Sequence, residues 1–190
     1  MITHKNGLMI NTMTHNKEVE ILDIVNENDL VIGSAPKDDM YSQKLLHRIV
    51  HVFVLHPESS SIYLQKRATT KSYLPGYYCT SAGGHVHSGE TYIEAAIREL
   101  KEEIGITTPI TEVDSFVFTS EDGHQRLVKT FITKASDGFS FTDGEVSDGG
   151  FYSVSDTKKL IDADEKVHPQ LKECFDRLYD KNGFDLIGKN

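Results

Sequence analysis

The sequence from Gly84 to Ile106, GHVHSGETYIEAAIRELKEEIGI, contains the clearest periodic pattern in this chain of 190 residues. Between Glu90 and Ile104, apolar residues recur at spacings of three and four, which places them on one stripe of a helix. They are Ile93, Ala96, Ile97, Leu100 and Ile104. Gly105 follows at a position suited to a left-handed cap, and Pro109 stands beyond it as a stop. The pattern predicts a helix over residues 90–104 that buries its apolar stripe against a sheet.

The sequence on both sides of this helix predicts strands. Residues 49–55 (IVHVFVL) and 61–65 (SIYLQ) are rich in β-branched and aromatic residues, and turn residues separate them, so adjacent antiparallel strands are expected. Further strands are expected at 18–25 and 30–33 as a hairpin, at 115–119 and 127–133 around the turn 121–123, and at 151–154. A second amphipathic helix is expected to begin at Pro169.

The alternation of these elements predicts an α/β sandwich with a mixed sheet. A length of 190 residues suits one hydrophobic core, so we expect a single domain over residues 18–190. Residues 1–17 show no periodicity and are expected to form a flexible N-terminal tail.

The composition is typical of a soluble globular protein, with 38% hydrophobic and 26% charged residues. A formal net charge of −9 argues against nonspecific binding to nucleic acid, which needs clustered Lys and Arg. Cys79 and Cys174 lie far apart and lack the spacing of a zinc site. No apolar run resembles a signal peptide or a membrane span, so we expect a cytoplasmic protein with reduced thiols.

Three glutamates of the predicted helix, Glu99, Glu102 and Glu103, are spaced i, i+3 and i+4. Their carboxylates therefore share one helix face, where like charges repel one another. Most such triplets are solvated surface. Here Gly83-Gly84 lets a backbone carbonyl approach whatever the carboxylates bind. Carboxylate and carbonyl oxygens are the ligands that Mg²⁺ and Mn²⁺ select, so the pattern indicates a metal site.

The same segment resembles the box of the Nudix hydrolase family: Gly, five residues, Glu, seven residues, Arg-Glu, an apolar residue, any residue, Glu-Glu, any residue, Gly and an apolar residue. Every specified position is met, by Gly84, Glu90, Arg98, Glu99, Leu100, Glu102, Glu103, Gly105 and Ile106. From average residue usage, a chance match is on the order of 10⁻⁷. The resemblance is therefore specific, although the box covers a small part of the chain.

The resemblance implies a Nudix-type α/β/α sandwich and a Mg²⁺-dependent hydrolase, with Mn²⁺ as a substitute. Its substrate would be a small-molecule diphosphate, such as a nucleoside diphosphate-X or a related organic diphosphate. Glu99, Glu102 and Glu103 would be catalytic metal ligands, helped by the Gly83 carbonyl. Metal ions neutralise oxygen charge and lower the pKa of the attacking water, so no covalent nucleophile is needed. Dimers are common in the family, which leaves a homodimer open, and the group attached to the diphosphate is not specified.

Other residues in and near the box receive supporting roles by the same resemblance. Glu90 and Arg98 are assigned mainly to structure, as an ion pair that holds the loop on the helix, and Gly84 and Gly105 are also structural. Glu145 is the best acid outside the box for a catalytic base or an extra metal ligand, although a plain loop acid has the same pattern.

Three further side chains are candidates for substrate binding. Lys66 and Arg67 follow a predicted strand and could meet a substrate phosphate, but an ordinary exposed basic pair fits equally well. His85 lies near the predicted metal, where an imidazole can contact metal or phosphate, or simply pack locally.

A second resemblance supplies the main alternative function. Segments 46–50 (LHRIV), 64–67 (LQKR) and 74–78 (LPGYY) resemble isopentenyl diphosphate isomerase, a Nudix-fold enzyme, and its hydrolase-like relatives. By this resemblance, His85 and His47 match two metal-binding histidines of the isomerase. An isomerase is therefore the runner-up.

The chain departs from the isomerase pattern at the chemically important positions. Gly83 stands at the position of the catalytic Cys, and Cys79 lies four residues too early. The paired acids of the isomerase fall at His124 and Arg126, and its further metal-binding His falls near Met40. These departures favour hydrolysis over isomerisation.

A noncatalytic Nudix-like module that binds a nucleotide or a partner protein is the third hypothesis. The complete set of box carboxylates weighs against it, because their mutual repulsion is costly without a metal. Mg²⁺-dependent cleavage of diphosphates would distinguish a hydrolase from such a module.

Overall fold

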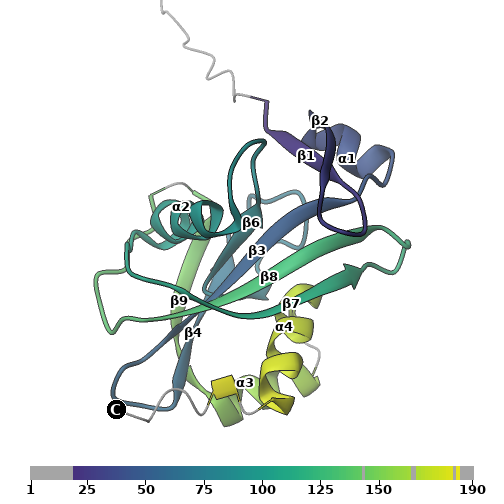
Figure 1. Cartoon of the computed structure of the whole chain (residues 1–190). Coiled ribbons are helices and arrows are strands. Elements are labelled where there is room, and N and C mark those ends of the chain that lie inside the picture. Colours follow the sequence, from purple (N-terminus) through teal and green to yellow (C-terminus); the bar gives the residue numbers. More distant parts are fainter. Residues whose placement is uncertain (1–18, 143, 164–165, 182, 185–190) are drawn as a thin grey trace, which may run out of the picture.

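Seven strands form one mixed sheet in the part of the chain that the structure describes (Figure 1). The structure is a computed structural model that describes residues 19–142, 144–163, 166–181 and 183–184, so the tail expected at 1–17 lies outside the described residues. The strands are β3 (His47–Leu55), β4 (Ser61–Arg67), β5 (Tyr78–Cys79), β6 (Ala82–His85), β7 (Thr111–Thr119), β8 (Gln125–Lys134) and β9 (Val146–Ser153). They follow the order β5-β4-β3-β8-β7, with β6 beside β3 and β9 beside β4. β3 and β8 are parallel and the other pairs are antiparallel, which confirms the expected mixed sheet.

β3 is central because its side chains enter two apolar cores. All of its residues except Arg48 are buried. One core contains Ile49, Phe53 and Leu55, and the other contains Val50, Val52 and Val54. A strand that is apolar on both faces requires a covering layer on each side of the sheet.

Helices supply these two layers (Figure 1). α2 (Tyr92–Ile104) packs on the face with the three valines, and α3 (Val154–Ala163) and α4 (Pro169–Asp180) pack on the opposite face. Leu100 of α2 and Phe175 of α4 are fully buried in these contacts. The expected α/β fold, with helices on both faces of a mixed sheet, is confirmed.

A hairpin and a short helix lie next to one end of the sheet (Figure 1). They are β1 (Ile21–Val25), β2 (Val31–Pro36) and α1 (Lys37–Ser42). The hairpin is therefore confirmed, with its second strand extended to Pro36. Asp23 of β1 accepts a hydrogen bond of 2.6 Å from the Ser88 hydroxyl, which attaches the hairpin to the loop before α2.

The other expected elements are present with shifted bounds. β3, β4, β7, β8 and β9 match the predicted strands, and α4 matches the second helix. β3 and β4 pair only at Val54↔Tyr63 and Leu55↔Ile62, because β6 occupies the preceding part of that edge. Within the described residues, no helix is both long and apolar enough to cross a membrane.

The buried stripe of α2 differs from the predicted one. Ile93, expected on this stripe, is 54% exposed, whereas Glu99 and Glu103 are only 9% and 4% exposed. The helix therefore turns two acidic side chains toward the interior, which the apolar periodicity does not predict.

Candidate metal site

Local sequence determines where α2 begins and ends. Thr91 is the N-cap, and it forms a capping box with Glu94. Gly105 ends the helix in a left-handed conformation with φ 77°, as predicted. A Cβ at this position would also overlap the Ser140 hydroxyl, so only glycine allows the loop containing Ser140 to approach.

α2 holds the three predicted ligands at different depths. Glu99 and Glu103 are buried, while the Glu102 side chain is 53% exposed. Arg98 Nη1 donates to Glu99 Oε1 at 2.7 Å and to Glu102 Oε2 at 3.1 Å. One guanidinium therefore contacts two of the three carboxylates and offsets only part of their charge.

Arg98 also connects the helix to the loop that precedes it. Its Nε and Nη2 donate to the two carboxylate oxygens of Glu90 at 2.9 and 3.0 Å. Nη2 donates in addition to the His85 carbonyl at 2.8 Å, and Glu90 accepts from the His87 amide at 3.0 Å. The structure thus brings Glu90 and Arg98 together in an ion pair that holds the loop on the helix.

Gly83 and Gly84 of β6 leave space on opposite faces of the sheet. A Cβ on Gly84 would lie 2.6 Å from Glu99 Cδ, so the missing side chain makes room for this carboxylate. A Cβ on Gly83 would lie 2.6 Å from His51 Nδ1. The sequence predicts a role for the Gly83 carbonyl, but the contact observed is from its amide, which donates to Glu103 Oε2 at 2.8 Å.

Burial and mutual repulsion disfavour ionisation of the inner carboxylates. Burial raises the pKa of Glu99 to about 6 against the lowering effect of Arg98, and the charges of Glu102 and Glu145 add to the rise. Burial and the charge of Glu99 raise the pKa of Glu103 well above its usual range. A bound divalent cation would favour the ionised form of both groups.

The donor set suits Mg²⁺ or Mn²⁺, because it consists of carboxylate oxygens. Among the described residues, no group of three His, Cys, Asp or Glu side chains could hold a metal ion as they are arranged. Glu99 and Glu102 are turned toward Arg98, and Glu103 Oε2 is turned toward Gly83. A cation would therefore compete with N–H donors for these oxygens.

Glu145, predicted from outside the box, lies close to the carboxylates of α2. Its charge contributes to the raised pKa values of Glu99 and Glu103. Its own carboxylate forms an ion pair of 2.8 Å with Lys71, and its carbonyl accepts from the Ala68 amide at 2.8 Å. These contacts attach the loop after β4 to the segment that carries Glu145.

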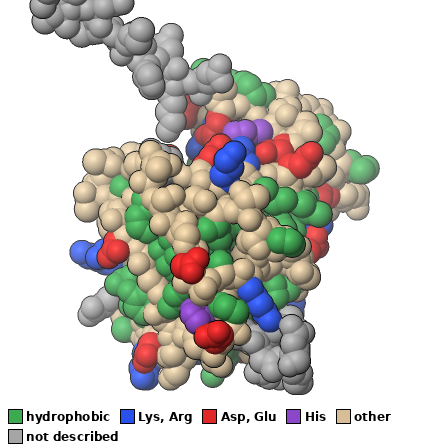
Figure 2. All heavy atoms as spheres, turned by 90° about the vertical axis from the view of Figure 1, so that its left-hand side faces the viewer, with side chains coloured by type: hydrophobic (Ala, Val, Ile, Leu, Met, Phe, Trp, Pro, Cys, Tyr) green, Lys and Arg blue, Asp and Glu red, His purple; other side chains and the backbone are tan. Residues whose placement is uncertain are grey.

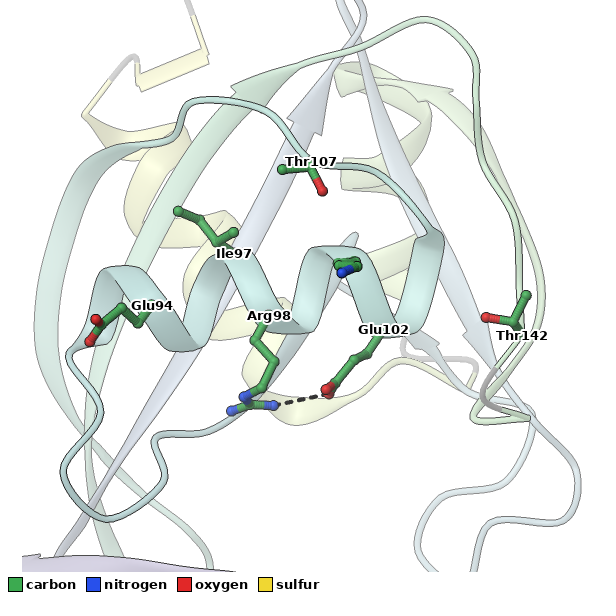
Figure 3. A pocket seen from close by; sticks show the side chains of 7 residues that line it. Glu94, Ile97, Arg98, Glu102, Thr107 and Thr142 are labelled. Atoms are coloured by element: carbon green, nitrogen blue, oxygen red, sulfur yellow. Dashed lines mark hydrogen bonds and ion pairs between the residues drawn. The ribbon is translucent and has the colours of Figure 1, made fainter.

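A hollow of about 670 Å³ lies along α2 (Figure 3). Arg98, Lys101 and Glu102 form the helix side of this hollow, and Thr142 faces it from the loop between β8 and β9. Its other lining residues are Glu94, Ile97 and Thr107. On the face shown in Figure 2, acidic, basic and histidine side chains gather in one region. Because Glu102 lines the hollow and its side chain is 53% exposed, its carboxylate is accessible from the hollow.

His85 belongs to a cluster of imidazoles. The ring centres of His85 and His124 lie 5.5 and 5.2 Å from that of His47, and the Tyr41 hydroxyl lies 2.8 Å from His85 Nε2. Burial lowers the pKa of His47 to about 4, and burial together with the Lys37 charge lowers the pKa of His85 well below its usual range. If His85 binds substrate as predicted, it would therefore do so with a neutral imidazole ring.

The same cluster departs chemically from the isomerase pattern. The guanidinium of Arg126 lies 5.2 Å from the Tyr41 ring centre, and its Nη2 lies 3.3 Å from His124 Nδ1. Met40 is completely buried. A cation and a thioether thus occupy positions where the isomerase resemblance expects an acid and a metal-binding histidine.

Lys66 and Arg67 contact residues that lie close to them in the sequence. Arg67 donates from Nε and Nη2 to the Tyr73 carbonyl at 3.2 and 3.1 Å. Lys66 Nζ lies 5.6 Å from the centre of the Tyr78 ring. Contact of this basic pair with a substrate phosphate stays a prediction.

Two residues at the site are missed by reasoning from the sequence. Gln65 of β4 donates from Nε2 to Glu103 Oε2 at 2.9 Å, and Lys71 pairs with Glu145. The strand pattern places Gln65 in the sheet, but its partner is 38 residues away and depends on how α2 packs. Lys71 lies in a loop without any periodic signal.

Comparison with known proteins shows relatives of two kinds. The family model described as NUDIX domain matches residues 45–175. The uncharacterized Nudix hydrolase YfcD of Escherichia coli K12 is 38% identical over 131 residues, which cover 68% of this chain and 71% of the relative. Isopentenyl-diphosphate Delta-isomerase 2 of Photorhabdus laumondii is 40% identical over 99 residues, which cover 52% of this chain and 55% of the isomerase.

Solved structures agree with this relationship. DR0079 from Deinococcus radiodurans superposes with a TM-score of 0.73 at 27% identity, covering 84% of this chain and 99% of that one. The MutT protein from Methanosarcina mazei superposes with a TM-score of 0.62 over 72% of this chain and 95% of that one, and at 18% identity it shows the shared fold alone. The box, the fold and the family match lead to one conclusion: the chain belongs to the Nudix hydrolase family.

Proposed function

We propose that this protein is a Mg²⁺-dependent hydrolase that cleaves the diphosphate linkage of a nucleoside diphosphate-X or a related organic diphosphate. The observation that carries the proposal is the pair of buried carboxylates, Glu99 and Glu103, on the helix of the Nudix box. Burial and mutual repulsion disfavour ionisation of both groups, and a divalent cation between them would offset that repulsion and favour their ionised forms. A chain with a formal net charge of −9 also needs a local cation to attract a polyanionic substrate.

The residues of the site would have three different roles. Glu99, Glu102 and Glu103 would hold the cation, which when bound supplies charge neutralisation and a water of lowered pKa. Glu145 is the proposed extra ligand or base, because it lies close enough to influence both buried carboxylates. Arg98 keeps the loop before α2 in place through its ion pair and its bond to a backbone carbonyl.

A screen of organic diphosphates with and without Mg²⁺ tests the proposal. We expect at least one compound to be cleaved at the diphosphate, and only when the metal is present. If the protein binds such compounds but cleaves none at any Mg²⁺ or Mn²⁺ concentration, it is a noncatalytic binding module.

Mn²⁺ should bind to the parent protein with millimolar or tighter affinity, and at least about tenfold more weakly to Glu103→Gln. Calorimetric titration measures both affinities. Glu112→Gln is the matched control, since Glu112 is an exposed glutamate on β7 paired with Lys129, and its loss should leave Mn²⁺ binding unchanged. Equal affinities of parent and Glu103→Gln would remove Glu103 from the ligand set.

Cys79→Ala should keep diphosphatase activity within a fewfold of the parent. Burial and the charge of Glu103 raise the pKa of the Cys79 thiol to about 11, so it is not a ready nucleophile. Steady-state kinetics on the folded variant measure this. A collapse of activity would favour the Cys-based chemistry of the isomerase alternative.

A further inference from the structure

Gln65 lies on β4, almost fully buried, with its amide against the helix of the proposed metal site. Its Nε2 donates to Glu103 Oε2 at 2.9 Å, and the Gln65 residue is 2% exposed. The Gly83 amide donates to the same oxygen at 2.8 Å. Two strands, β4 and β6, therefore hold one oxygen of a carboxylate that belongs to α2.

These two bonds restrain Glu103 differently from the other carboxylates. Two N–H donors on one oxygen fix the rotation of the carboxylate, so the direction of the second oxygen, Oε1, is also defined. Neither donor carries a charge. Arg98, by contrast, places a cation against Glu99 and Glu102 and so competes with a metal for them.

We propose that Gln65 is a positioning residue for the metal: it holds Glu103 Oε2 so that Oε1 is presented to the cation. The inference rests on the proposed function, because it requires a divalent cation at Glu103. Hydrogen-bond partners of metal ligands orient those ligands, and their loss typically weakens metal binding by about 10–100-fold. If Gln65 contributed only to packing in the core, its removal would change stability and leave metal affinity unaltered.

Gln65→Met removes the amide and keeps the length and approximate volume of the side chain. We expect Mn²⁺ affinity, measured from the electron paramagnetic resonance signal of free Mn²⁺, to fall by about tenfold or more. The Mg²⁺ concentration for half-maximal hydrolysis should rise by a similar factor, with kcat at saturating Mg²⁺ little changed. Gln65→His should restore most of the affinity, because its Nε2–H can replace the amide donor.

Thr130→Val is the matched control for loss of a buried polar group. Thr130 is fully buried, and its hydroxyl donates to Cys174 of α4, on the face of the sheet opposite α2. Like Gln65→Met, this variant loses an internal hydrogen bond, but we expect its Mn²⁺ affinity to equal that of the parent.

The outcomes separate this inference from the proposed function. Parental Mn²⁺ affinity in folded Gln65→Met would overturn the role of Gln65 and leave the hydrolase proposal intact. A parent protein that binds no Mn²⁺ would overturn both. Should Gln65→Met not fold, Gln65→Asn decides, because its amide is one methylene shorter and cannot reach Glu103. Weakened Mn²⁺ binding by Gln65→Asn supports the inference, and parental binding overturns it.

Discussion

Glu99→Gln and Glu102→Gln should each lower turnover of the hydrolysed diphosphate by at least about 10²-fold, the scale of losing an electrostatic or acid–base contribution. Glutamine keeps nearly the shape of glutamate but offers a neutral oxygen, which is a much weaker ligand for a hard cation. Arg98 can still donate to the amide oxygen of either variant, so the loop before α2 should stay in place. The measurement is kcat at saturating Mg²⁺.

Stability measurements distinguish a metal site from a solvated acidic surface. The pKa of Glu99 is raised to about 6 in the folded state. As pH rises from the pKa of a glutamate in the unfolded chain through this value, ionisation of Glu99 therefore lowers the stability of the fold. At neutral pH without metal, Glu99→Gln should therefore melt at the same temperature as the parent or slightly higher. Mg²⁺ should stabilise the parent more than either variant, because linked stabilisation follows affinity for the folded state.

Glu112→Gln again serves as the control, and it should keep both parental turnover and the full stabilisation by Mg²⁺. Unchanged turnover in both Glu99→Gln and Glu102→Gln would show that the cluster is only a solvated face. The hydrolase assignment would then have to be abandoned.

Gly84→Ala should also reduce turnover by about 10²-fold, the cost associated with displacing a reacting group by about 1 Å. The new Cβ would overlap Glu99 Oε1 and lie 2.6 Å from its Cδ, so the carboxylate must move. The overlapping atoms are the end of a flexible side chain. The free energy of unfolding should therefore fall by less than about 1.5 kcal/mol, which urea denaturation would measure alongside kcat.

Two other glycines show how the effect depends on what the new Cβ meets, and Gly150 serves as the control outside the site. At Gly83, a Cβ would lie 2.7 Å from the backbone carbonyl of Val50, so Gly83→Ala should destabilise the fold by about 1–3 kcal/mol. At Gly150, the nearest atom is Tyr152 Cε2 at 3.9 Å, so Gly150→Ala should change neither stability nor turnover. Parental turnover in Gly84→Ala would mean that Glu99 does not need its present position, contrary to its assignment as a ligand.

Much of the fold could be predicted because local patterns determine it. β3 is recognisable from a run of β-branched and aromatic residues, and Gly105 marks the end of α2 through a backbone conformation that favours glycine. α1 and α3 escaped prediction since each is short and buries few apolar side chains. Met40 is the buried residue of α1, and Thr157 and Ile161 are those of α3.

The interior of the site could not be predicted from periodicity. Acidic residues normally face solvent, yet Glu99 and Glu103 are buried and Ile93 is exposed. The missing side chain of Gly84 on β6 leaves room for Glu99, and Gln65 on β4 donates a hydrogen bond to Glu103. The approach of Gln65 to Glu103 depends on the rotation and placement of α2 over the sheet. A contact that depends on how two elements pack does not appear as a regular spacing of residues in the sequence.

The parallel pairing of β3 with β8 has a consequence for the order in which the chain folds during its synthesis. Their register runs from His47↔Arg126 to Leu55↔Lys134, so the pair closes a long loop that contains the whole Nudix box. Closing a loop of this length has a large entropic cost, and contacts between distant residues form slowly. When β8 is still inside the ribosome, β3 has already emerged with one edge and two apolar faces incompletely covered. Over that interval the unpaired edge and the apolar faces of β3 favour aggregation of the nascent chain.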